Sequence, residues 1–228
     1  MNQAEPLLAK FAKGMLRQNP SAPKQAEIWN IENALDWLKT MWPLDHLSLK
    51  DLTFRSALLL AICSPKRASE LAAFTLDQLR KSDTIWEFRL LSTKNRGYGK
   101  PHTATFEAFA ADSSLCPITT LKAYLQATDD IRQEEKRIFL SFKRPHKPIT
   151  AATMARWLKQ CLELAGIEGY TGHSTRSAAT SKAVTIGLSA NQIMEAANWS
   201  KKGSTFQRFY HKDIEGSFQE AVLKSGLN

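Results

Sequence analysis

Two residues that can hold an anion, His173 and Arg176, stand near the start of the stretch "TGHSTRSAATSKA", residues 171–183. The small residues that repeat along this stretch are typical of a helix packed into a protein interior. Because residues three positions apart on a helix share one face, both side chains can contact the same ligand. A core histidine followed by a surface arginine would give the same pattern, so the pair alone is weak evidence for an anion site.

Other residues that could serve the same anion are scattered along the chain. Arg67 and Glu70 are also three positions apart, directly after a long apolar segment, where an arginine without a counter-charge would be costly. Lys94 lies in the turn-prone "TKNRGYGK", Trp199 follows a predicted helix end at "EAANW", and Tyr210 lies in "STFQRFYHK". Taken singly, Trp199 and Tyr210 are more simply explained as core aromatics, and Lys94 as a solvated turn residue.

The elements that must position these residues are mostly helices. Apolar residues at helical spacing, or helix-start signals, occur in residues 26–41, 48–63, 66–79, 117–128 and 150–166. Two stretches rich in β-branched and aromatic residues, 84–91 and 102–109, flank the turn around Lys94 and predict a β-hairpin with a basic tip. The predicted fold is therefore mainly α with a small β-hairpin or sheet, an α+β domain.

Three segments are expected along the chain. Residues 17–25 hold two prolines and no periodicity, which predicts a linker after a short N-terminal helix. We therefore divide the chain into a stub helix and linker (1–25), a main domain (26–213) and a short C-terminal helix or tail (214–228).

The charge of the chain indicates a polyanionic partner. It has 31 Lys plus Arg against 22 Asp plus Glu, a net charge of +9 and a pI near 9.5, which favours nucleic acid over an acidic membrane surface. No apolar run approaches the roughly 20 residues that a membrane-spanning helix requires. Three scattered cysteines suggest reduced thiols, and neither a zinc site nor a metallohydrolase centre is expected.

In their order along the chain, these residues resemble the catalytic signature of the tyrosine recombinases, the phage-integrase-like enzymes. The matching stretches are "SPKRASEL", "STKNR", "GHSTR", "ANWS" and "FQRFYHK", within residues 45–215. The family signature runs Arg, Lys, His-x-x-Arg, His or Trp, and Tyr. The sequences "HSTRSAATSKA" and "ANWS…FYHK" are most similar to those of the Crypton-like branch, which is carried by eukaryotic transposons. The resemblance implies that residues 26–213 form a catalytic domain.

The resemblance assigns four residues to a phosphate of DNA. Arg67 and Arg176 would clamp its non-bridging oxygens, because a planar guanidinium matches phosphate with two hydrogen bonds. His173 would hydrogen-bond the same phosphate or help to deprotonate the nucleophile. Glu70 would hold Arg67 or the histidine in position.

Three more residues complete the site that the resemblance implies. Tyr210 would attack phosphorus and form a 3′-phosphotyrosyl bond, which conserves the energy of the broken diester, so that no cofactor or metal is required. Lys94 would protonate the leaving 5′-oxygen. Trp199 stands where the family most often has histidine, and its indole N–H can donate to the phosphate but cannot exchange a proton at neutral pH.

The resemblance also implies partners and a setting. Double-stranded DNA would be bound by a homo-oligomer, from dimer to tetramer, docked through residues 214–228, with no membrane and no small-molecule substrate. The family usually has a core-binding domain before its catalytic domain, so residues 1–25 would be its remnant or its connection. The location would be the nucleus in a eukaryote and otherwise the cytoplasm, at the nucleoid. Further contacts with the DNA backbone would come from Arg96, Lys143, Arg144, Lys147, Lys201 and Lys202. Without the resemblance, these residues are more simply explained as solvated surface side chains.

The function expected from this resemblance is site-specific DNA recombination, for integration or excision of a mobile element through a Holliday junction. A type IB topoisomerase shares the same constellation but relaxes supercoils as a monomer, which the predicted docking tail disfavours. A domesticated DNA-binding protein without chemistry is the third possibility. It is disfavoured because every catalytic position holds a competent residue.

Overall fold

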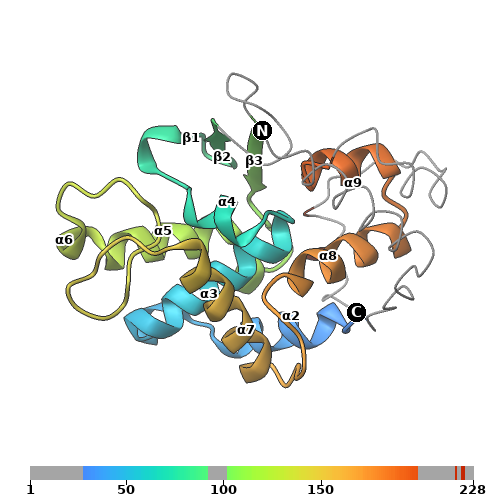
Figure 1. Ribbon diagram of the computed structural model, residues 1–228, viewed down its shortest axis with the longest axis horizontal. Coiled ribbons are helices and arrows are strands. Elements are labelled where there is room, and N and C mark those ends of the chain that lie inside the picture. Colours follow the sequence, from blue (N-terminus) through green and yellow to red (C-terminus); the bar gives the residue numbers. More distant parts are fainter. Residues whose placement is uncertain (1–27, 92–101, 200–218, 220–221, 224–228) are drawn as a thin grey trace, which may run out of the picture.

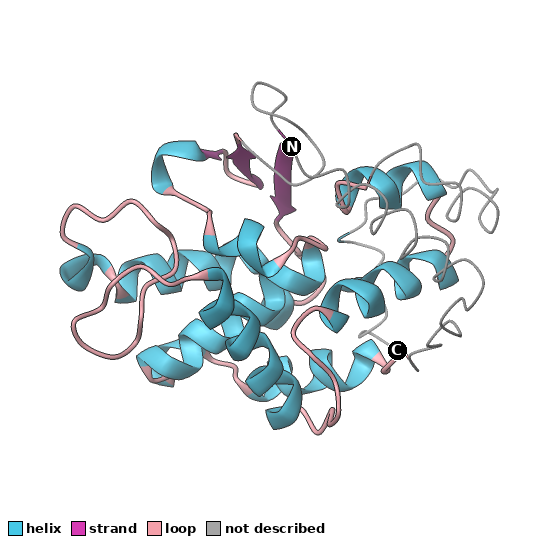
Figure 2. Ribbon diagram, viewed as in Figure 1, coloured by secondary structure: helices cyan, strands magenta, loops and turns pink. Residues whose placement is uncertain are grey.

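A computed structural model describes residues 28–91, 102–199, 219, 222 and 223 of the chain. Its α-helices are α2 (Ile31–Thr40), α3 (Leu49–Cys63), α4 (Ala68–Ala72), α5 (Pro117–Ala127), α6 (Asp129–Arg132), α7 (Ala151–Leu164), α8 (Ser174–Thr185) and α9 (Ala190–Ala196). Short 3₁₀ turns occur at Leu44–His46, Leu76–Gln78 and Ser113–Leu115, and the strands are β1 (Leu79–Lys81), β2 (Ile85–Leu90) and β3 (His102–Glu107). The fold is mainly helical with one small sheet, as predicted (Figures 1 and 2).

Helix α3 is the centre around which the other helices pack. It begins at Ser48, whose hydroxyl accepts a hydrogen bond from the Asp51 backbone N–H at 3.2 Å, as the capping pattern predicts. From Leu52 to its end every residue is buried, because the helix is apolar on all sides and contacts α5, α7 and α8. Arg55 lies in this interior and donates to the carbonyl oxygens of Leu38 and Ser114. The end of α3 leads directly into the segment that carries Arg67.

The small sheet is antiparallel with strand order β1-β2-β3, and it lies at one side of the helices (Figure 2). Trp86 pairs with Phe106 and Phe88 pairs with Ala104, so that alternate residues of β2 and β3 face the core. Phe74 stacks on Phe88 with ring centroids 4.3 Å apart, which holds the sheet on the segment after α4. The predicted hairpin strands are confirmed, and β1 adds a third strand.

The sequence pattern predicts a helix over residues 66–79, and this prediction is wrong for most of its length. Helix α4 ends at Ala72, and the chain then turns through Leu76–Gln78 into β1. The reason is pairing with a distant segment: the Ile138 N–H donates to the Phe74 carbonyl at 2.8 Å, and the Leu76 N–H donates to the Lys136 carbonyl at 2.7 Å. These backbone bonds replace the helical ones.

The last helices are attached to the first by side-chain contacts. The Trp29 indole N–H donates to the Ser174 hydroxyl at 2.8 Å, and Lys182 forms an ion pair with Glu32 at 2.7 Å. These contacts join α2 and the segment just before it to α8, whose buried face consists mainly of alanine and threonine, as the small residues predict. Figure 1 shows α8 beside α3, with α9 at one end of the molecule and α6 at the other.

Candidate active site

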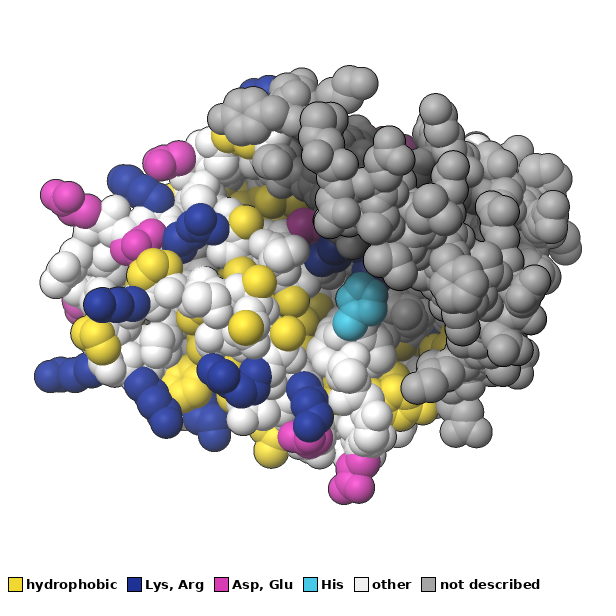
Figure 3. Space-filling view, viewed as in Figure 1, with side chains coloured by type: hydrophobic (Ala, Val, Ile, Leu, Met, Phe, Trp, Pro, Cys, Tyr) yellow, Lys and Arg dark blue, Asp and Glu magenta, His cyan; other side chains and the backbone are white. Residues whose placement is uncertain are grey.

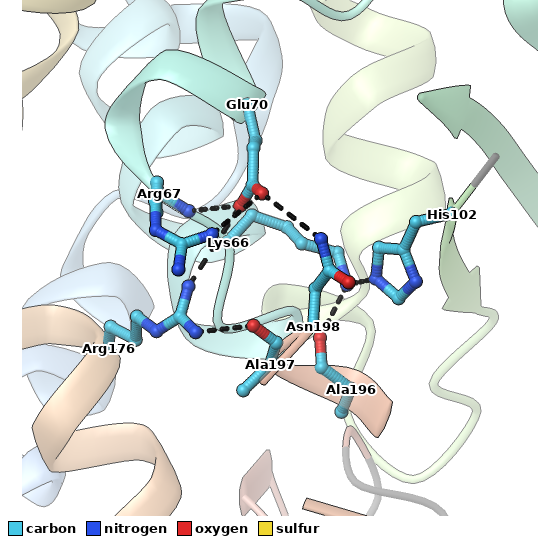
Figure 4. Close-up of polar contacts among 8 residues, drawn as sticks. All are labelled: Lys66, Arg67, Glu70, His102, Arg176, Ala196, Ala197 and Asn198. Carbon is cyan, nitrogen blue, oxygen red and sulfur yellow. Dashed lines mark hydrogen bonds and ion pairs between the residues drawn. The ribbon is translucent and has the colours of Figure 1, made fainter. Parts of the chain in front are cut away.

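Arg67, Glu70 and Arg176 meet in one cluster, although they come from distant parts of the chain. Arg67 is the N-cap residue of α4, Glu70 lies in α4, and Arg176 lies in α8. Arg67 Nη1 is 3.1 Å from Glu70 Oε1, and Arg176 Nη1 is 3.9 Å from Glu70 Oε2. Figure 4 shows both guanidinium groups near this carboxylate. Three of the predicted site residues are therefore brought together.

The Glu70 carboxylate holds the cluster in place. Its Oε2 accepts a hydrogen bond from the Arg67 backbone N–H at 2.8 Å, which caps the start of α4. Its Oε1 accepts hydrogen bonds from Arg67 Nη1 at 3.1 Å and from Asn198 Nδ2 at 3.5 Å. The side chain is buried, and a buried carboxylate is costly unless it is paired in this way. Among the described residues, one carboxylate faces two guanidinium groups, so this set of three carries a net positive charge.

Arg176 is firmly held and still has an unused hydrogen-bond donor. Its side chain is almost fully buried, and its Nη2 donates to the carbonyl oxygen of Ala197. Its Nη1 is at ion-pair distance from Glu70 but makes no hydrogen bond. Burial lowers the pKa of Arg176 to about 10, helped by the charge of Arg67 and opposed by Glu70, so the group is charged at neutral pH. An oxygen of a bound anion would satisfy this N–H group.

Trp199 is placed beside Arg176 by the end of α9. Asn198 has a left-handed backbone with φ of 51°, and its N–H donates to the Glu195 carbonyl at 3.0 Å. The Trp199 N–H donates to the Met194 carbonyl at 2.8 Å, which completes a Schellman motif. The Trp199 ring centroid then lies 5.2 Å from the guanidinium carbon of Arg176, within the range of a cation–π contact. The structure therefore adds Trp199 to the cluster.

His173 lies at the rim of the cluster. It is exposed and is the N-cap residue of α8, whereas Arg176 is buried one turn later, so the two side chains differ more in environment than their spacing suggests. The protein around this exposed residue desolvates it only in part, which lowers the pKa of His173 below its ordinary value, with smaller contributions from the positive charges of Arg176 and Arg67. The imidazole is therefore neutral at pH 7. In this form it can hydrogen-bond a phosphate or accept a proton.

A groove with basic walls lies on α7 and the loop before it. It encloses about 430 Å³ and is lined by Lys143 and Lys147 from the loop and by Arg156 from α7, with Phe142 and Trp157 among its aromatic residues. Arg144 is exposed in the same loop. The exposed ends of Lys and Arg side chains are spread over the face that carries α3 and α7 (Figure 3). The three loop residues predicted to contact the DNA backbone, Lys143, Arg144 and Lys147, are thus exposed.

The segment before His173 packs on α7, the helix that carries part of the groove. The backbone of Gly172, which precedes His173, packs so closely on α7 that a Cβ atom would lie 2.4 Å from the carbonyl oxygen of Ala155. Ala155 is next to Arg156, which lines the groove. The segment that leads to His173 therefore packs directly on α7, the helix that carries Arg156 of the groove.

The remaining predicted site residues lie outside the described residues. These are Lys94, Tyr210 and three predicted backbone contacts, Arg96, Lys201 and Lys202. Their assignments stay predictions.

Metal ligation and membrane insertion find no support in the part of the chain that the structure describes. Within residues 28–91 and 102–199, no group of three or more His, Cys, Asp or Glu could hold a metal ion. No helix among the described residues is long and apolar enough to cross a bilayer. All three cysteines are free and buried, and burial raises the pKa of Cys63 and Cys161, which makes these thiols unreactive.

Three residues that contact the cluster or its neighbours were missed from sequence. Asn198 donates to Glu70, and Lys66 lies against His102 with 2.6 Å between Lys66 Nζ and His102 Nε2. Asn198 could have been found, because asparagine directly after a helical stretch is typical of the left-handed position that ends a helix. Nothing in the sequence near Lys66 indicates that its side chain is buried or which residue it meets.

The fold is similar to that of solved recombinases. The structure of XerA recombinase matches with a TM-score of 0.57 at 18% identity, over 90% of this chain and 64% of that one. XerH site-specific recombinase bound to its difH substrate matches with a TM-score of 0.56 at 14% identity, over 79% and 48% of the two chains. FLP recombinase in a Holliday junction complex matches with a TM-score of 0.52 at 17% identity, over 97% and 57%.

These likenesses establish the class: the chain has the fold of a tyrosine recombinase catalytic domain. The chain belongs to the phage integrase family, whose model matches residues 30–215. It spans from 48% to 64% of the length of the three recombinases above. No curated protein sequence matches it.

Proposed function

We propose that this chain is a site-specific recombinase that cuts and rejoins DNA strands through a 3′-phosphotyrosyl intermediate. The observation that carries the proposal is the buried Arg176, held beside Arg67 around one carboxylate, with an Nη1 N–H group that makes no hydrogen bond. Two guanidinium groups against a single carboxylate leave positive charge for one phosphodiester. Fixed donors of this kind stabilise the charge that develops on the phosphate oxygens during transfer.

In the proposed reaction, Tyr210 is the nucleophile. Its phenolic oxygen forms a bond to phosphorus while the bond from phosphorus to the 5′-oxygen breaks, and the electron pair leaves with that oxygen. Lys94 gives a proton to the 5′-oxygen, and the neutral His173 hydrogen-bonds the phosphate or takes the phenolic proton. Rejoining is the reverse, with the 5′-hydroxyl of a partner strand as nucleophile. No cofactor is consumed, since the phosphotyrosyl bond keeps the energy of the diester.

The groove on α7 is proposed as part of the DNA path. A duplex with one phosphate at the cluster would extend over the surface that holds Lys143, Arg144, Lys147 and Arg156. Cations at such positions contact phosphates and release counterions, and so strengthen binding without reading the base sequence. Among the similar structures, XerH is bound to its difH substrate and FLP is in a Holliday junction complex, which supports DNA as the substrate here.

Finer features of the proposal come from the sequence resemblance. The sequence around His173 and Trp199 supports a Crypton-like recombinase of a mobile element. We propose that it acts in the nucleus of a eukaryotic host or at the nucleoid of a prokaryotic one. Residues 214–228 are proposed to dock on a neighbouring protomer in a dimer or tetramer on DNA, and residues 1–25 to be either the remnant of a core-binding domain or a connection to one.

The direct test is trapping of the covalent intermediate. The protein is incubated with a nicked suicide duplex, and a DNA–protein adduct is sought on denaturing gels. Tyr210→Phe should abolish the adduct, whereas Tyr170→Phe, a matched control outside the cluster, should not. Arg67→Ala and Arg176→Ala should lower the adduct rate by about 100- to 1,000-fold, as loss of one oxyanion donor does.

Each outcome decides a part of the proposal. An adduct that survives Tyr210→Phe places the nucleophile elsewhere. Parental rates in either arginine variant remove the phosphate assignment of the cluster. DNA binding without any adduct in the parental protein favours a DNA-binding protein without chemistry.

A further inference from the structure

Lys66 lies next to the cluster, and its contacts join three separate elements. It directly precedes Arg67, and its side chain is only 3% exposed. Lys66 Nζ lies 2.6 Å from His102 Nε2, in the first residue of β3, and donates to the carbonyl oxygen of Ala196, the last residue of α9. Figure 4 shows this side chain running from the arginine segment to the strand and to the helix end.

The chemistry of the contact fixes the state of His102. An ammonium group has hydrogen-bond donors and no acceptor, so the Nε2 atom of His102 must accept with its lone pair. The ring is then neutral, with its proton on Nδ1. A protonated ring would place two cations 2.6 Å apart, in a site where both side chains are buried.

The end of α9 receives two cationic donors at successive carbonyls. Lys66 donates to the Ala196 carbonyl, and Arg176 donates to the Ala197 carbonyl. The C-terminal carbonyls of a helix carry partial negative charge and lack partners within the helix, so cations stabilise them. The residues that follow are Asn198, which bonds Glu70, and Trp199, which faces Arg176.

We propose that Lys66 is a positioning residue of the phosphate site: by joining His102 of β3 to the last turn of α9, it sets the positions of Asn198 and Trp199 against the two arginines. Lys66 makes no contact with the phosphate in this role. The inference rests on the proposed function, because its consequence is the geometry in which the cluster meets a phosphodiester.

The test separates positioning from stability by two substitutions. In Lys66→Met/His102→Leu both members of the Lys66–His102 pair are replaced by apolar groups of similar size, so neither of them is left without the other, and the loss is confined to the Ala196 carbonyl, which no longer accepts from Lys66. This variant should therefore fold and unfold cooperatively, with a modest decrease in its unfolding temperature. Its rate of adduct formation should fall by about 10- to 100-fold, the order expected for a misplacement of about 1 Å in a catalytic site.

A conservative variant serves as the matched control. His102→Gln keeps an acceptor oxygen for Lys66 and should form the adduct at a rate close to the parental rate. If Lys66→Met/His102→Leu is folded and also reacts at the parental rate, Lys66 does not position the site. If the double variant does not fold, the comparison of His102→Gln with His102→Leu decides, since equal adduct rates in these two would overturn the proposal.

A second readout does not depend on Tyr210 chemistry. Inorganic phosphate is titrated into each variant and followed through the ring signals of His173 by NMR. The double variant should bind phosphate several-fold more weakly, and the His102 ring should carry its proton on Nδ1 in the parental protein. Unchanged phosphate affinity, or a proton on Nε2, would overturn the role of Lys66. Absence of the adduct in the parental protein, with phosphate binding sensitive to Lys66, would instead reject only the proposed function.

Discussion

Replacing Glu70 by glutamine removes the one carboxylate that faces both arginines while keeping the shape of the side chain. The side chain is 5% exposed and lies 3.1 Å from Arg67 Nη1 and 3.9 Å from Arg176 Nη1. The amide oxygen of glutamine can still accept the Arg67 backbone N–H. The change therefore tests charge more than packing, and we expect Glu70→Gln to leave the buried Arg176 and the partly exposed Arg67 in mutual repulsion.

The expected loss of stability follows from these distances. One ion pair at 4 Å has an energy of about 4 kcal/mol at an effective dielectric constant near 20, and part of this is offset because a neutral amide is easier to bury. Breaking a buried pair costs about 3 to 5 kcal/mol, and the retained hydrogen bond places Glu70→Gln near 3 kcal/mol. For a chain of this length, that corresponds to a fall in Tm of about 6 to 12 °C.

The measurement is thermal and urea unfolding of the parental protein, Glu70→Gln and a matched control, Glu163→Gln. Glu163 pairs with Lys159 at 3.2 Å, but both side chains are about half exposed, and such a pair contributes about 1 kcal/mol or less. Sulfate should stabilise Glu70→Gln more than the parental protein, because an anion can replace the lost charge. A Glu70→Gln variant as stable as Glu163→Gln would refute the claim that the cluster is held by its charge.

Three further outcomes are expected. Gly172→Ala should lower the unfolding free energy by about 1 to 3 kcal/mol, because the new Cβ would lie 2.4 Å from the Ala155 carbonyl oxygen. The control for backbone strain is Gly169→Ala, where the Cβ would meet open space but φ is 79°. Equal losses of unfolding free energy in the two variants would refute crowding as the cause. The pKa of His173, followed by NMR in DNA-free protein, should lie below 6.5. The stability that the protein gains from the neutral imidazole is then complete above pH 6.5 and is lost as the pH falls toward the pKa of the folded state. A pKa above 6.5 would contradict the desolvation assigned to His173. Lys147→Gln should reduce the slope of log affinity for DNA against log salt by about 1, whereas Lys159→Gln should not, and equal slopes would remove the groove from the DNA path.

Helices with a one-sided apolar pattern could be predicted well from the sequence. The predicted helix over residues 150–166 corresponds to α7, and its first turn is capped by Thr150, which accepts from the Thr153 N–H at 3.2 Å. The prediction for residues 66–79 failed after Ala72, where the chain pairs with residues 136–138 and then enters β1, a strand of three residues that pairs with β2. A strand this short has no period of its own, so its pairing with other segments decides its conformation.

The site divides in the same way between local and distant contacts. Arg67 and Glu70 are three residues apart, and their ion pair follows from helix geometry, which the sequence shows directly. The contact between Asn198 and Glu70 joins residues 128 positions apart, and that between Lys66 and His102 joins residues 36 apart. No spacing rule links such residues, and they became visible only once α9 and β3 were placed beside α4.

The choice of partners around Arg176 explains how a buried cation can remain available to a phosphate. Its Nη2 is fixed by a backbone carbonyl, which orients the guanidinium without cancelling its charge, and Glu70 is shared with Arg67. Arg55 shows that carbonyl partners alone are not enough, because it also donates to two carbonyls but is 0% exposed inside α3. The difference is access: the Arg67 side chain is 21% exposed and His173 is at the surface, so the cluster opens where an anion can enter. A carboxylate for each arginine would have made the same site more neutral and less able to bind DNA.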